Sequence, residues 1–172
     1  MGTRSHIGFR KGNEVRYIFV ATDGYNHGKT LKAIGREECE KIWDAIGEAD
    51  SKGQFVWLSH LYTDNMFEKC YCREPQPTAR TPMVAQEPNW SDAYLKKEGY
   101  KLSGVIKIES RFTVNPVNML EMYNDEGTAW MYDFDNDMVL FSGNPDWVDM
   151  DTMDYGSVVK ERFDRHHEYA AF

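Results

Sequence analysis

Residues 130–141 read Trp-Met-Tyr-Asp-Phe-Asp-Asn-Asp-Met-Val-Leu-Phe, and this order of side chains predicts a β-hairpin. Successive side chains of a strand point to opposite faces, so the aromatic residues at 130, 132 and 134 share one face while Met131, Asp133 and Asp135 share the other. The Asp-Asn-Asp that follows is typical of a turn, and the final four residues form the return strand. We therefore expect a folded hairpin with one aromatic face.

A second hairpin is expected near the N-terminus, where Gly12-Asn13 separates two β-rich runs. Farther along, the apolar residues from Cys39 to Ile46 follow the i, i+3, i+4, i+7 spacing of a helix that runs from Arg36 to Gly47. Residues 29–34 fit either a short strand or the first turn of a helix. The other expected elements are strands at residues 5–9, 15–21, 54–62 and 101–112, a short helix at 91–98, a helical turn at Asn144-Pro145, and a charged helix at 159–170.

These elements predict a mixed α+β fold, with an antiparallel, hairpin-rich sheet and two or three helices. A chain of 172 residues is long enough for one domain with an ordinary hydrophobic core. Residues 73–90 hold four of the six prolines and predict an irregular loop, because proline lacks the backbone N–H and restrains the preceding residue. We expect a single domain over residues 1–172, with this proline-rich loop and an acidic segment at 112–159.

The charges are distributed unevenly along the chain, with an excess of carboxylates in the acidic segment. Residues 112–159 contain ten carboxylates and no Lys or Arg, so the formal net charge of −8 is −10 in this segment and +2 elsewhere. This distribution argues against direct nucleic-acid binding by phosphate neutralisation, and it suits a protein that presents a negative face to a basic partner.

The acidic segment also carries eight aromatic residues and six of the nine methionines, which are side chains enriched in protein interfaces. Neighbouring carboxylates on one strand face would offer spaced charges to a basic groove, and imitation of DNA is one version of this idea. The residues predicted to bind a partner are Asp133, Asp135, Asp137, Asp146, Trp147, Asp149 and Asp151.

An alternative ligand-binding loop lies between the first hairpin and the helix. Its candidate residues are Asp23, Tyr25, His27 and Lys29. The loop resembles a phosphate-binding loop but has three residues between its glycines where the Walker form needs four, and the clear helical stripe begins only at Cys39. A Ser/His/Asp set could also be assembled here from Ser5, His6, Asp23 and His27, and the simpler interpretation is a turn.

Metal sites are not predicted. Asp133-x-Asp135-x-Asp137 imitates the start of a calcium loop, but Met138 stands where glycine is required and Asn144 where glutamate is required. Cys39, Cys70 and Cys72 are best explained as reduced thiols rather than as a zinc site with His60. We expect no cofactor.

A membrane association is not predicted either. No apolar run reaches the roughly 18 to 20 residues that cross a bilayer, and the first residues lack the apolar core of a secretory signal. The expected location is the cytoplasm.

The sequence resembles a family of small proteins of tailed bacteriophages. The resemblance is carried by Met1-Gly-Thr-Arg-Ser-His-Ile7 and by Asp23-Gly-Tyr25, and it covers about 25 residues well. Family members typically begin Met-x-Thr-Arg-Ser-x-Ile and carry Trp-Asp-Gly-Tyr, where this chain has Thr22 in place of the tryptophan. The resemblance implies a phage origin and the host bacterial cytoplasm, but no activity.

We therefore predict a non-enzymatic phage accessory protein that binds and inhibits a host protein, of defence or nucleic-acid processing, through an acidic face. One alternative is a small enzyme that acts on a nucleotide-like ligand through the loop of Asp23 to Lys29, with His6 or His60. Another is a minor virion or assembly component. The oligomeric state stays open, a homodimer included.

Overall fold

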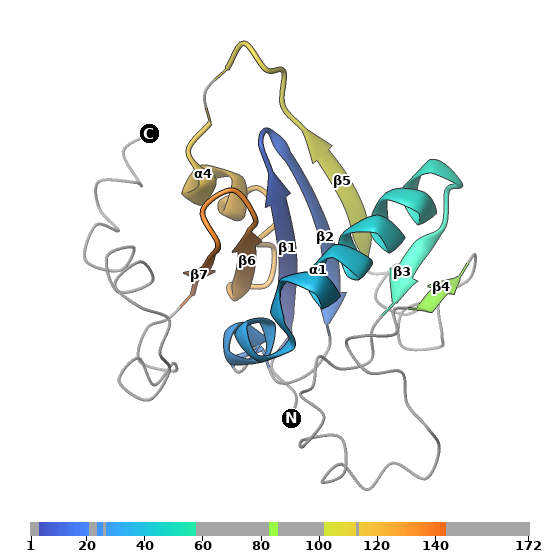
Figure 1. The fold of residues 1–172 in the computed structure, drawn as a ribbon, viewed down its shortest axis with the longest axis horizontal. Helices are drawn as coiled ribbons and strands as arrows, with labels where there is room; N and C mark the ends of the chain where they lie inside the picture. Colours follow the sequence, from blue (N-terminus) through green and yellow to red (C-terminus); the bar gives the residue numbers. More distant parts are fainter. Residues whose placement is uncertain are drawn as a thin grey trace, which may run out of the picture.

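The computed structural model describes residues 4–20, 24–25, 27–57, 83–85, 102–112 and 114–143. Within these residues the chain forms a five-stranded sheet, a separate two-stranded sheet and two helices (Figure 1). The elements are β1 (Ser5–Lys11), β2 (Glu14–Val20), α1 (His27–Ser51), β3 (Phe55–Trp57), β4 (Met83–Ala85), β5 (Ser103–Lys107), α4 (Pro116–Glu121), β6 (Ala129–Asp133) and β7 (Met138–Ser142). The predicted α+β class is confirmed.

Both predicted hairpins are present. β1 and β2 pair antiparallel around Gly12-Asn13, and Gly12 has a φ of 56°, a left-handed conformation that glycine adopts at no steric cost. β6 and β7 pair antiparallel across the turn at residues 134–137. The strand order is β5-β2-β1-β6-β7, and β1 pairs with β6 in parallel, from His6 opposite Ala129 to Arg10 opposite Asp133. The two hairpins therefore meet in the centre of a mixed sheet.

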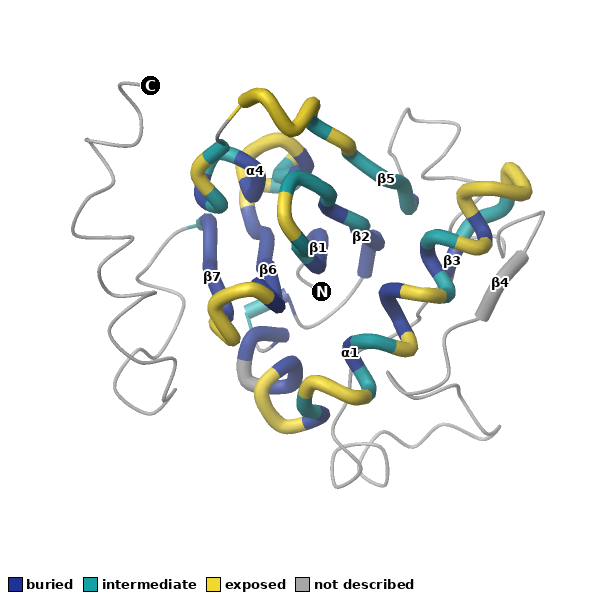
Figure 2. Tube along the Cα trace, turned by 45° about the horizontal axis from the view of Figure 1, so that its top comes forward, coloured by how far each residue is buried: buried dark blue, intermediate teal, exposed yellow. Residues whose placement is uncertain are grey.

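Helix α1 packs across one face of this sheet (Figure 2). Its buried side chains include Cys39, Ile42, Trp43 and Ile46, so the predicted helical stripe is confirmed. These residues pack against the aromatic face of β6 and the neighbouring strands in one hydrophobic core. The helix starts earlier than the stripe suggests, because the residues before position 36 are also helical, and a break at Gly35 separates the two parts.

The opposite face of the sheet is covered by the short helix α4. Val117, Met119 and Leu120 are buried there, and the last two pack with Met131 in a second core. Asn115 caps the helix, since its side chain accepts a hydrogen bond from the N–H of Val117 at 2.9 Å, and proline occupies the first helical position. This helix was not among the expected elements, although the Asn-Pro pair that begins it is a recognised start signal.

The structure describes only some of the other expected strands and helices. The strands expected at residues 54–62 and 101–112 are represented by β3 and β5. The helices expected at 91–98 and 159–170 and the turn at Asn144-Pro145 lie outside the described residues, as does the proline-rich loop apart from β4. No helix in the described part of the chain is both long and apolar enough to span a membrane.

Candidate functional site

The tips of the two hairpins meet around a buried carboxylate, Asp133. Arg10 Nη1 donates to both carboxylate oxygens of Asp133 at 3.0 Å, and the Asp133 side chain is only 2% exposed. The same carboxylate accepts hydrogen bonds from the backbone N–H of Asp135 at 3.0 Å and from Asn136 Nδ2 at 2.8 Å. One buried side chain therefore ties the β6–β7 turn to β1.

This position corrects the sequence interpretation of Asp133. The alternation along β6 does place it opposite the aromatic face, as predicted. However, the parallel pairing of β1 with β6 sets Arg10 directly beside it, so its charge is used inside the protein. Asp133 is not available to a partner.

The next two carboxylates of the turn do reach the surface. The Asp135 side chain is 45% exposed, accepts a hydrogen bond from the N–H of Gly12 at 2.8 Å, and lies 3.6 Å from Arg10 Nη1. Asp137 is exposed, has a φ of 51°, and accepts a hydrogen bond from the Tyr132 hydroxyl. The other predicted partner-binding residues, Asp146, Trp147, Asp149 and Asp151, lie outside the described residues.

Helix α1 brings further carboxylates to the same end of the sheet. Glu40 pairs with Lys11 at 2.5 Å, which joins the tip of the first hairpin to the helix. Glu37 and Asp44 are exposed on the same stripe of α1, and neither forms an ion pair within the described part of the chain. We call Glu37, Asp44, Asp135 and Asp137 the acidic rim.

A pocket of about 320 Å³ lies between the break in α1 and the second hairpin. Among the residues that the structure describes, its lining consists of Lys32, Gly35 and Arg36 from the helix and of Tyr132, Asp137 and Val139 from the hairpin. Arg36 is held in position, since its Nη1 donates to the carbonyl oxygen of Phe134 at 3.0 Å and its guanidinium lies 5.3 Å from the centre of the Phe134 ring.

The Tyr132 hydroxyl stays protonated in this pocket. Burial is the largest cause of its raised pKa, and the hydrogen bond to the Asp137 carboxylate raises the pKa further. Arg36 lowers it by a smaller amount. The described part of the lining therefore combines two cations, one carboxylate and one neutral hydroxyl.

Within the alternative loop of Asp23 to Lys29, the described residues pack against the core. Tyr25 is half-buried, His27 is fully buried, and the Trp130 Nε1 donates to the carbonyl oxygen of Gly24 at 2.5 Å. A side chain on Gly28 would overlap the Trp130 ring, so backbone and indole are in close contact. Asp23 and the side chain of Lys29 lie outside the described residues.

One sequence argument about this loop is wrong. α1 begins at His27, so a helix does open at the loop, contrary to the inference that it began too late for phosphate binding. The contact with Trp130 provides a better reason against a phosphate-binding loop, because the indole ring packs directly against the backbone of Gly28.

The proposed Ser/His set is only partly assembled. Ser5 Oγ and His27 Nδ1 lie 2.6 Å apart, but both residues are fully buried, which leaves no access for a substrate. His6 is also buried, and the centre of its ring lies 5.8 Å from that of Tyr17 and 5.4 Å from that of Phe19. The Ser5–His27 contact ties β1 to the start of α1. In the described ranges, no group of three or more His, Cys, Asp or Glu side chains is placed to hold a metal ion.

The described residues thus define an α+β domain with a charged junction between two hairpin tips and a helix. No family model matches the sequence, and searches of curated proteins and of solved structures find no significant match.

Proposed function

We propose that this protein is a non-enzymatic binding protein that docks on a basic surface of a partner through its acidic segment and the adjoining acidic rim. The observation that carries the proposal is the charge distribution, with ten carboxylates and no Lys or Arg over residues 112–159. Asp135 and Asp137 support it, because both are exposed at the hairpin tip. The resemblance to phage proteins makes a host protein of defence or nucleic-acid processing the partner of choice.

Electrostatic complementarity mainly raises the rate of association. Carboxylates on a hairpin tip and a helix attract a basic partner before contact. At physiological ionic strength, salt largely screens this attraction at separations beyond about 8 to 10 Å. The hairpin is well suited to hold such charges, because the buried Asp133 fixes its turn through two backbone N–H groups and the Asn136 side chain. We therefore expect fast association that slows steeply as salt is added.

The experiment begins with affinity capture from bacterial lysate at low and high salt, followed by identification of the bound protein. The purified partner is then used to measure association rates for the wild type and for the double variant Asp135→Asn, Asp137→Asn. Asparagine tolerates the left-handed backbone of Asp137 and keeps a carbonyl acceptor for Tyr132. We expect the association rate at low salt to fall about 3- to 10-fold.

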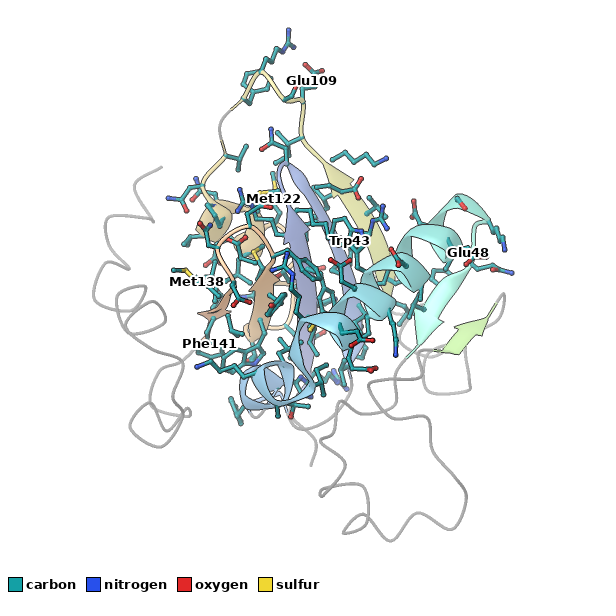
Figure 3. All side chains as sticks on the ribbon, in the orientation of Figure 1. Trp43, Glu48, Glu109, Met122, Met138 and Phe141 are labelled. Atoms are coloured by element: carbon teal, nitrogen blue, oxygen red, sulfur yellow. The ribbon has the colours of Figure 1, made fainter. Side chains whose placement is uncertain are left out.

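The matched control is Glu48→Gln with Asp50→Asn, which removes the same charge at the far end of α1. Both side chains are exposed, and Figure 3 shows Glu48 well away from Met138, where the second hairpin resumes after its turn. The proposal requires the control to associate like the wild type. Equal rates for all three proteins, or rates that do not depend on salt, would contradict it.

A further inference from the structure

The pocket beside the break in α1 has a local charge opposite to that of the whole protein. Among the lining residues that the structure describes, Lys32 and Arg36 contribute two positive charges and Asp137 one negative charge, a formal sum of +1 in a chain of −8. Its volume of about 320 Å³ lies at the lower end of the range for small-molecule sites, which suits a small ligand.

The break at Gly35 lies in the wall of this pocket. Gly35 has φ 79° and ψ 174°, a conformation that is essentially restricted to glycine. Lys32 from the first part of the helix and Arg36 from the second part both line the pocket, together with Gly35 itself. The glycine-specific break and the two positive side chains therefore lie in the same pocket wall.

The guanidinium of Arg36 is preorganised for an anion. Its contacts with the Phe134 carbonyl and ring use one edge and one face, and the planar guanidinium has further N–H groups for a second acceptor. Arginine and lysine together are typical ligands for phosphate and carboxylate groups. Val139 and the Tyr132 ring supply apolar surface for the rest of a small molecule.

We propose that this pocket binds the phosphate or carboxylate group of a small molecule, with Lys32 and Arg36 as the groups that hold the anion. This site adjoins the partner surface proposed above and shares Asp137 with it. Asp137 also lines the pocket, and its negative charge weakens the binding of an anion. Removal of this charge should therefore tighten anion binding.

The experiment measures binding of inorganic phosphate and of malonate by isothermal titration calorimetry. The variants are Lys32→Gln, Arg36→Gln and Asp137→Asn, and the control is Lys52→Gln, an exposed lysine in the turn that follows α1. We expect saturable binding to the wild type, about 5- to 10-fold weaker binding for each of the first two variants, and several-fold tighter binding for Asp137→Asn. The control should match the wild type.

The better of the two anions identifies the group that the pocket prefers. Circular dichroism of each variant checks its fold, because Arg36→Gln also removes the hydrogen bond to Phe134. If that variant unfolds, Lys32→Gln and Asp137→Asn carry the test alone. Absence of saturable binding of both anions by the wild type would overturn the proposal, as would equal affinities for the wild type, Lys32→Gln and Asp137→Asn.

Discussion

Replacement of Asp133 by alanine should destabilise the protein far more than replacement of the exposed carboxylate next to it. The Asp133 side chain is 2% exposed and the Arg10 side chain 12% exposed, so the ion pair is largely withdrawn from water. Alanine at position 133 would leave the Arg10 guanidinium buried without its main partner. It would also leave the N–H groups of Asp135 and Asn136 without their acceptor.

The size of the effect follows from these contacts. Removal of one partner from a buried ion pair costs about 3–5 kcal/mol, and each lost hydrogen bond of the turn about 1 kcal/mol. Asp135 lies 3.6 Å from Arg10 and can offset part of the loss. We therefore expect the free energy of unfolding to fall by about 4 kcal/mol, a large share of the roughly 5–15 kcal/mol typical of a domain.

Urea unfolding followed by tryptophan fluorescence provides the assay, since Trp43 and Trp130 are both buried in the core. With a slope of about 2 kcal/mol per molar urea, the midpoint should fall by about 2 M. The control Asp135→Asn should change the free energy by less than about 1 kcal/mol, because that carboxylate is partly exposed.

A double-mutant cycle with Arg10→Met tests the cause. If Asp133 acts mainly by neutralising Arg10, the double variant should be less destabilised than the sum of the single variants, by at least about 2 kcal/mol. Strictly additive losses, or a loss for Asp133→Ala no larger than for Asp135→Asn, would refute the reasoning.

Three further predictions concern the break in α1, the packing at its start and the response to pH. Gly35→Ala should lower the free energy of unfolding by about 1–3 kcal/mol in urea, although alanine is the better helix former, because its φ of 79° and ψ of 174° suit only glycine; a gain in stability would contradict the break. Gly28→Ala should lower the melting temperature through overlap with the Trp130 ring, at a cost of about 1–3 kcal/mol, and an unchanged melting temperature would contradict that contact. Burial raises the pKa of the Cys39 thiol from 9.0 to about 12, so its contribution to stability is complete below pH 9 and is lost as the pH rises towards 12. Cys39→Ala should therefore flatten the decline in unfolding free energy above pH 9 by up to about 1.4 kcal/mol per pH unit, whereas an unchanged slope would count against this assignment.

Local patterns were sufficient to predict the hairpins. The Gly12-Asn13 turn and the alternation over residues 130–141 describe contacts between neighbours in the chain, and both are present as expected. The parallel pairing of β1 with β6 joins residues more than a hundred positions apart, and no local pattern carries that information. The misinterpretation of Asp133 follows from this gap, because its partner Arg10 is 123 residues away in sequence.

The first part of α1 shows a different limit. Leu31 and Ile34 are buried like the stripe that follows, but the break at Gly35 changes the phase, so a single 3.6-residue period does not join the two parts. The pocket was not predicted for the same reason. It is lined by residues 32–36 and by residues 132–139, and the approach of these two segments is not visible in the sequence alone.

Asp137 links the two proposed sites, and its position has a thermodynamic consequence. It belongs to the acidic rim and also lines the pocket together with Lys32 and Arg36. A basic partner that approaches Asp137 would neutralise the charge that opposes an anion in the pocket, and an anion in the pocket would in turn neutralise the cations that repel a basic partner. The two binding events should therefore favour each other by the same factor, as linkage requires. Phosphate at saturating concentration should tighten partner binding at constant ionic strength, and this gain should disappear in Asp137→Asn. A decrease in partner affinity would instead mean that both ligands compete for one surface.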